Sequence, residues 1–280
     1  MYIRCWGARG SIPVSGMEYN RYGGDTTCME IRNAADDIIV VDAGSGIRRL
    51  GNTLLREGRF DVTLLFTHAH WDHVLGLPFF KPLYMPGSNI NIHGCPFAMD
   101  DLLSILRKVM NAPDFPVEYD QLLSTRQHTV ACGLEMTLGE MTITSIPLNH
   151  PNQGQGYKFE EAGRTFVFLT DNELDFEHQG GLKFEDYLAF SKGADLLVHD
   201  AEYLLPEYEK LTRGWGHSYY LQALDLAIQA EVKAFGLFHH NQDRDDDAVD
   251  QMVEDCRKVV RDKGVTMEVY ALTQSQEITF

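Results

Sequence analysis

In the stretch LLFTHAHWDHVLGL, residues 64–77, several side chains of the types that can bind metal ions follow an apolar run. Three histidines and one aspartate fall within six residues: His68, His70, Asp72 and His73. Residues two apart on an extended segment point to the same side, so His68 and His70 face together. A turn after them would bring Asp72 and His73 back toward that side. Neutral imidazole and carboxylate groups bind zinc and similar ions, so we expect a metal site directly after a buried strand.

Three further apolar runs also stop at a histidine or an aspartate. His150 follows MTITSIPLN, Asp171 follows TFVFLT, and the pair His239 and His240 follows AFGLF. Functional loops gather at one edge of a rigid scaffold, so these side chains can complete the site. Adjacent residues on a strand point to opposite faces, so only one of His239 and His240 is expected to reach the metals.

The hydrophobic pattern predicts strands first, and then an alternation of helices and strands in both halves of the chain. This order, with helices enough to cover two sheets, is typical of a layered α/β sandwich. Strands are expected within residues 36–44, 61–68, 89–94, 133–148, 156–171, 194–203, 232–240 and 266–272, and helices within 45–58, 97–110, 218–231 and 245–263.

Length and composition are those of an ordinary globular protein. The chain has 280 residues and 44% hydrophobic residues, and no linker divides it, so we expect one domain over residues 1–280. The formal net charge of -17 disfavours steering toward nucleic acid. We expect no signal peptide and no membrane span. The five scattered cysteines, none in a CxxC pair, argue against a disulfide framework and favour a cytoplasmic location.

The motif THAHWDH, followed by the strand-end residues, resembles the metallo-β-lactamase superfamily along essentially the whole chain. The resemblance implies an α/β fold, an αββα four-layer sandwich of two mixed β-sheets flanked by helices, with a two-metal hydrolytic site. It assigns the first metal to His68, His70 and His150, the second to Asp72, His73 and His240, and a bridging role to Asp171. The choice of His240 over His239 rests on this matching alone.

Two divalent ions held in this way would lower the pKa of a shared water and supply hydroxide near neutral pH. Zinc is the expected metal, with manganese or iron as alternatives, because histidine and carboxylate ligands accept all three. Asp72 is expected to be catalytic as well as a ligand. Asp42, at the end of its own strand, is either a hydrogen-bond acceptor behind a ligand histidine or an ordinary turn aspartate.

Two later segments narrow the choice within the superfamily. HDAEY, residues 199–203, and GHSYY, residues 216–220, resemble a paired motif of the ribonuclease Z and phosphodiesterase branch. The match departs at Asp200, where that branch usually has glutamate, and at Tyr219, where it usually has threonine. The resemblance implies that His217 contacts the scissile phosphate or protonates the leaving oxygen, with Asp200 orienting it. His199, one step from Asp200, is expected to be a structural strand histidine.

The expected function is therefore a metal-dependent phosphodiesterase that acts through metal-bound hydroxide on a small phosphodiester, such as a cyclic nucleotide or a short oligonucleotide. Ribonuclease Z carries a long arm that grips transfer RNA between the counterparts of His150 and Asp171, and only residues 151–170 intervene here. Alternatives are a thioester or lactone hydrolase on the same scaffold, and a non-hydrolytic di-iron protein or metal-bound sensor. We expect no long nucleic acid and no membrane as partners, and leave a homodimer open.

Two other groups of residues have an open role. The segment WGARGSIPVSGMEYNRYGGDTT, residues 6–27, is rich in glycine and has arginines on or near it. The pattern favours a hairpin loop that needs glycine for positive φ angles over a phosphate-binding loop, because the segment has neither P-loop nor GxGxxG spacing. The second group consists of the aromatic residues Trp71, Phe79, Phe80 and Tyr84. They could line the cleft beside the metals and stack on a base, although aromatic residues near a motif more often belong to the hydrophobic core.

Overall fold

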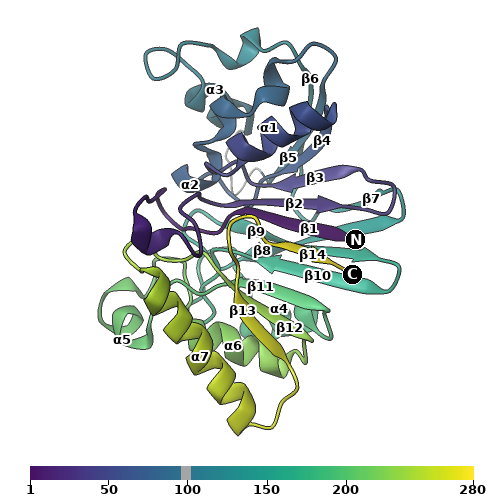
Figure 1. Cartoon of the computed structure of the whole chain (residues 1–280). Helices are drawn as coiled ribbons and strands as arrows, with labels where there is room; N and C mark the ends of the chain where they lie inside the picture. Colours follow the sequence, from purple (N-terminus) through teal and green to yellow (C-terminus); the bar gives the residue numbers. More distant parts are fainter. Residues whose placement is uncertain (96–101) are drawn as a thin grey trace.

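Two seven-stranded β-sheets pack face to face at the centre of the structure, a computed structural model that describes residues 1–95 and 102–280 (Figure 1). The first sheet has the strand order β14-β1-β2-β3-β4-β5-β6 and the second β13-β12-β11-β10-β9-β8-β7. Each sheet is mixed, with three antiparallel pairings on one side and three parallel pairings on the other.

The strands of the first sheet are β1 (Tyr2–Gly7), β2 (Cys28–Arg32), β3 (Ile38–Val41), β4 (Asp61–Leu65), β5 (Asn89–Gly94), β6 (Thr125–Val130) and β14 (Glu277–Thr279). Those of the second are β7 (Glu135–Leu138), β8 (Met141–Leu148), β9 (Gly154–Glu161), β10 (Arg164–Leu169), β11 (Leu196–Asp200), β12 (Ala234–Phe238) and β13 (Glu268–Ala271). The helices are α1 (Ile47–Glu57), α2 (Trp71–Val74), α3 (Leu102–Val109), α4 (Phe184–Ser191), α5 (Leu205–Glu207), α6 (Tyr220–Gln229) and α7 (Asp246–Asp262). Short 3₁₀ or π turns are η1 (Met17–Tyr19), η2 (Leu77–Phe79), η3 (Lys81–Tyr84), η4 (Tyr119–Gln121) and η5 (Tyr208–Thr212).

Side-chain alternation within the strands separates three layers of core. In β3, Ile39 and Val41 face the other sheet, whereas Ile38 and Val40 face the helices of their own side. Strands buried on both faces are apolar throughout, which explains the continuous runs in the sequence. Figure 1 shows α1 and α3 on one outer side and α4, α6 and α7 on the other. The predicted αββα four-layer sandwich is therefore confirmed.

The helix expected over residues 97–110 is described from Leu102 onward as α3, and its first residues, 97–101, lie outside the described part of the chain. Within the described residues, the helices are all too short or too polar to cross a bilayer.

One expectation about the cysteines is wrong. Cys95, after β5, and Cys132, after β6, form a disulfide, while Cys5, Cys28 and Cys256 are free and buried. These strands are neighbours in the sheet, so the pair joins residues that are 37 apart in sequence. The cytoplasmic location stays a prediction, and the cysteine argument no longer supports it.

Candidate metal centre

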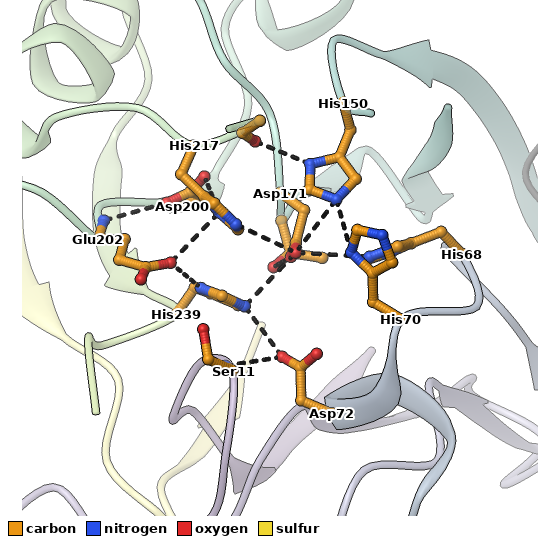
Figure 2. Close-up of polar contacts among 12 residues, drawn as sticks. Ser11, His68, His70, Asp72, His150, Asp171, Asp200, Glu202, His217 and His239 are labelled. Carbon is orange, nitrogen blue, oxygen red and sulfur yellow. Dashed lines mark hydrogen bonds and ion pairs between the residues drawn. The ribbon is translucent and has the colours of Figure 1, made fainter. Parts of the chain in front are cut away.

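The first cluster of the site gathers three histidines and one aspartate at the ends of strands. His68 and His70 follow β4, His150 follows β8 and Asp171 follows β10, and their inward atoms all lie within 4.8 Å of one another. The His150 Nε2 atom is 2.9 Å from His70 Nδ1, and His68 Nε2 is 3.6 Å from Asp171 Oδ2 (Figure 2). The residues assigned to the first metal therefore lie together.

The second cluster contains Asp72 and His73, which lie in α2, and His239, which follows β12. The His239 Nε2 atom is 3.2 Å from Asp72 Oδ2. Asp171 lies between the clusters, because its Oδ2 is 3.6 Å from His68 Nε2 in the first cluster and its Oδ1 is 3.4 Å from His73 Nε2 in the second. One carboxylate thus faces both clusters, as a bridging ligand must.

The prediction that His240 belongs to the second cluster is wrong. The His240 ring is fully buried away from the cluster, where its Nε2 donates to the Leu272 carbonyl and Tyr22 packs edge-on against it. Burial, followed by the positive charge of Arg9, lowers the pKa of His240 to about 3, so it is a neutral core residue. His239 turns inward because its φ is 57°, which ends the strand alternation on which the choice depended.

A left-handed backbone recurs at Asp42, Asp171 and His239, three positions of the site that come within two residues of a strand end. Asp42 after β3 has a φ of 64°, and Asp171, two residues after the end of β10, has a φ of 53°. Non-glycine residues hold this conformation only where the surroundings enforce it, and such residues cluster at functional sites. Gly10 makes room for the inward His239 ring, since a Cβ at Gly10 would lie 2.3 Å from the His239 Nδ1 atom. The next residue, Ser11, donates its backbone N–H to Asp72 Oδ2 at 2.9 Å.

Asp42 is a hydrogen-bond acceptor behind His73 of the second cluster, rather than an ordinary turn residue. His73 Nδ1 donates to Asp42 Oδ2 at 2.7 Å, and Asp42 also accepts from the backbone and the hydroxyl of Thr67. Burial raises the pKa of Asp42 despite the nearby imidazole of His73. This contact fixes the tautomer of His73 and aims its Nε2 at Asp72 and Asp171.

The donor atoms fit a pair of divalent metal ions. The inward Nε2 atoms of His68 and His73 are buried and have no hydrogen-bond partner among the described residues. The outer nitrogens are bonded instead: His68 Nδ1 to Thr67 Oγ1, and His150 Nδ1 to the Gly216 carbonyl. Burial lowers the pKa of both His68 and His150 well below the usual range, which keeps them in the neutral form that binds metal. A histidine whose inward nitrogen has no partner and whose outer nitrogen is hydrogen-bonded has the arrangement that is typical of a metal ligand.

His217 lies at the edge of the two clusters and is held by two carboxylates. Its Nδ1 is 3.0 Å from Asp200 Oδ2 and 3.3 Å from Glu202 Oε2, and its Nε2 is 3.9 Å from Asp171 Oδ2. Burial lowers the pKa of His217, but Glu202, Asp200 and Asp171 outweigh burial and raise it to about 9. The two carboxylates therefore fix the orientation of the His217 ring, with its Nε2 toward Asp171.

Glu202 is the residue that reasoning from the sequence missed. It is fully buried, accepts from His239 Nδ1 at 2.8 Å, and also faces His217 Nδ1 (Figure 2). Its spacing could have revealed it, because residues 200 and 202 on an extended segment point to the same side. Asp200, Glu202, His217 and His239 also lie within 4.8 Å of one another. The Nδ1 atoms of both histidines have carboxylate partners, so this group is a hydrogen-bond network behind the metal site.

Glu202→Gln should weaken binding of the second metal by 10- to 100-fold, because the amide no longer orients His239 as a charged acceptor does. Metal titration followed by calorimetry measures the effect. Glu161→Gln is the matched control, since Glu161 is another buried carboxylate and pairs with the N-terminal amine instead. If the Glu202 variant and the wild type bound the metal with equal affinity, Glu202 would not be needed to orient His239 for metal binding.

A second buried carboxylate, Glu173, positions the loop that carries His217. It accepts from the backbone N–H groups of Gly214 and Gly216, from the Tyr208 hydroxyl and from His178 Nε2. The Gly216 carbonyl in turn accepts from a ligand histidine, so one loop connects both sides of the site.

Other residues singled out in the sequence have structural roles. His199 is fully buried and donates through Nδ1 to the carbonyl of Asp200. Arg9 donates to the backbone carbonyls of Gly23, Asn241 and Arg244, so it holds loops together and does not face the clusters. The N-terminal loop meets the site through Gly10 and the Ser11 backbone.

Comparison with known proteins agrees with this geometry. A beta-lactamase superfamily domain model matches residues 38–240. Ribonuclease Z of Thermococcus kodakarensis is 27% identical over 248 aligned residues, which cover 72% of this chain and 74% of that protein. Among solved structures, the metallo-beta-lactamase fold protein YhfI from Bacillus subtilis has a TM-score of 0.70 at 18% identity and covers 99% of this chain and 98% of its own. Unliganded yeast PDE1 has a TM-score of 0.68 at 15% identity and covers 100% and 99%.

The matched segment contains all the residues of the two clusters, from His68 to His239, and ends one residue later. The relatives fit the ribonuclease Z-like branch that HDAEY and GHSYY indicate. With its His and Asp clusters arranged to bind divalent metals, the chain is a metal-dependent hydrolase and belongs to the beta-lactamase superfamily.

Proposed function

We propose that the protein is a phosphodiesterase that hydrolyses a small phosphodiester, such as a cyclic nucleotide or a short oligonucleotide. The observation that carries this proposal is the position of His217. Two carboxylates hold its Nδ1, and its Nε2 faces the carboxylate that bridges the metal clusters. The leaving oxygen of an alkyl phosphodiester needs a proton, and a positioned imidazolium can supply one.

His68, His70, His150 and Asp171 would hold one ion, and Asp72, His73, His239 and Asp171 the other. When bound, two divalent ions supply an activated water and neutralise charge on the phosphate. We propose zinc, which suits sites rich in histidine and carboxylate, with manganese or iron as substitutes where they are more abundant.

The chain's own residues then orient the reaction. Water attacks phosphorus and releases a proton to solvent, the bond from phosphorus to the leaving oxygen breaks, and His217 Nε2 gives its proton to that oxygen and is protonated again from solvent. Asp200 and Glu202 stabilise the imidazolium before this transfer and hold the ring in one tautomer. The Ser11 backbone N–H keeps Asp72 oriented toward the second cluster.

Two observations support a small substrate over a long nucleic acid. Residues 151–170 are largely taken up by β9 and β10, which form an antiparallel pair, so no arm extends from this part of the chain. The net charge of -17 opposes binding of a polyanion outside the metal site. The ribonuclease Z relatives support cleavage of a phosphodiester bond, and we propose a shorter substrate than an RNA.

A substrate panel tests the proposal. Metal-loaded protein should hydrolyse bis(p-nitrophenyl) phosphate and 2′,3′- or 3′,5′-cyclic nucleotides at least ten-fold faster, in kcat/KM, than thioesters and lactones of similar size. Faster hydrolysis of a thioester or a lactone would instead favour an acyl-transfer enzyme on the same scaffold.

A further inference from the structure

A cavity of about 700 Å³ opens beside the metal centre on the side of the first cluster. The ligands His68, His70 and His150 form its floor. Its volume falls in the range that holds a drug-sized or nucleotide-sized ligand. A phosphodiester with its phosphate at the metals would therefore extend one of its two substituents into this space.

Trp71 forms one wall of the cavity, and its side chain is 66% exposed. The other aromatic residues near the motif are placed differently: Phe80 is fully buried, and the Tyr84 hydroxyl donates to the Pro78 carbonyl. Phe79 is 53% exposed, packs edge-on against Phe115 and does not line the cavity. Only the indole of Trp71 thus offers a free aromatic face next to the ligands, among the aromatics that the sequence singles out.

The rest of the lining combines apolar surface with amide groups. Ile105 and Val109 of α3 are half-buried and line the cavity. Asn152 and Gln153 also line it, in left-handed conformations, and their side-chain amides make no hydrogen bond to any described residue. A flat ring with donors and acceptors on its edge matches such a surface.

The charges of the lining distinguish a base from a second phosphate. Lys108 and Asp114, a cation and an anion, both line the cavity, so its described lining has no group of lysine or arginine side chains. Polyphosphates and polynucleotides bind where several cations gather. A neutral ring is therefore the better occupant.

We propose that this cavity binds the base of a nucleoside phosphodiester, stacked on Trp71, while the phosphate lies at the metal centre. This inference rests on the proposed phosphodiesterase function and adds its specificity: the substituent that stays on phosphorus is a nucleoside. Stacking on an aromatic side chain tolerates all bases, so the amides of Asn152 and Gln153 would select among them.

Two substrates with the same leaving group test the proposal: thymidine 5′-(p-nitrophenyl phosphate) and methyl p-nitrophenyl phosphate. The metal-loaded wild type should prefer the nucleoside by about ten-fold or more in kcat/KM. Trp71→Ala should bring this ratio close to one, and Trp71→Phe should keep most of it. Phe79→Ala, which removes an exposed aromatic outside the cavity, should leave the ratio unchanged.

Fluorescence gives a readout that does not depend on turnover. Thymidine 5′-monophosphate should quench the tryptophan emission of the wild type, and Trp71→Phe should abolish the quenching. If both substrates react at equal rates, or if the quenching persists in Trp71→Phe, the base site is wrong and the phosphodiesterase function stands. If the metal-loaded protein hydrolyses neither substrate, the proposed function fails, and the quenching alone then decides whether a base binds here.

Discussion

His239→Ala should remove one of two bound metal ions and lower kcat/KM on a phosphodiester on the order of 10³-fold, whereas His240→Ala should keep both ions. The reason is geometric. His239 Nε2 faces Asp72 and Asp171, while His240 Nε2 is engaged by the Leu272 carbonyl. A metal ion supplies several kcal/mol of transition-state stabilisation, and each 1.4 kcal/mol is a factor of ten in rate.

Elemental analysis of the purified variants measures the stoichiometry, and steady-state kinetics measures the rate. His240 is fully buried, so its alanine variant will be less stable by about 1–3 kcal/mol, and His240→Gln is the milder alternative if it folds poorly. Loss of one ion in the His240 variants, with retention of both in His239→Ala, would reverse the assignment of the second cluster.

His217→Ala should keep both metal ions and lower kcat on a cyclic nucleotide by 10²- to 10⁴-fold. The loss should be much smaller on bis(p-nitrophenyl) phosphate. A ribose alkoxide is strongly basic and needs a proton as it leaves, whereas p-nitrophenolate is stable without one. The difference between the two substrates therefore isolates proton donation from any general disturbance of the site.

Asp200→Asn provides the companion measurement. It keeps a side chain of the same shape beside His217 Nδ1 but removes the charge that favours the imidazolium. Its effect should have the same dependence on the leaving group and a smaller size. An equal loss on both substrates in His217→Ala would show that His217 positions the phosphate or supports a metal ligand, and does not donate a proton.

Much of the ligand set can be predicted from the sequence, because parallel strands buried on both faces are continuous apolar runs and their ends are visible. Asp171 comes soon after such an end. His150 follows β8, an antiparallel strand in which buried and partly buried side chains alternate, and both residues lie at the same edge of the sandwich as His68. The same reasoning predicts the four layers, since strands and helices alternate in both halves.

The missed features depend on information that periodicity does not contain. The choice between His239 and His240 fails because the strand ends in a left-handed residue, and alternation holds only for extended backbone. The inward position of the His239 ring also requires the close approach of Gly10, which is more than 200 residues away in sequence. The Cys95–Cys132 pair depends on the neighbouring positions of β5 and β6, which cysteine spacing alone does not reveal.

Metal reconstitution tests the central claim most directly. Protein stripped with a chelator and given zero, one or two equivalents of zinc or manganese should show no hydrolysis of a cyclic nucleotide, partial activity at most, and full activity, respectively. Phosphodiester hydrolysis that persists in metal-free protein would contradict the account. So would a protein that binds two ions at these clusters and hydrolyses no phosphodiester.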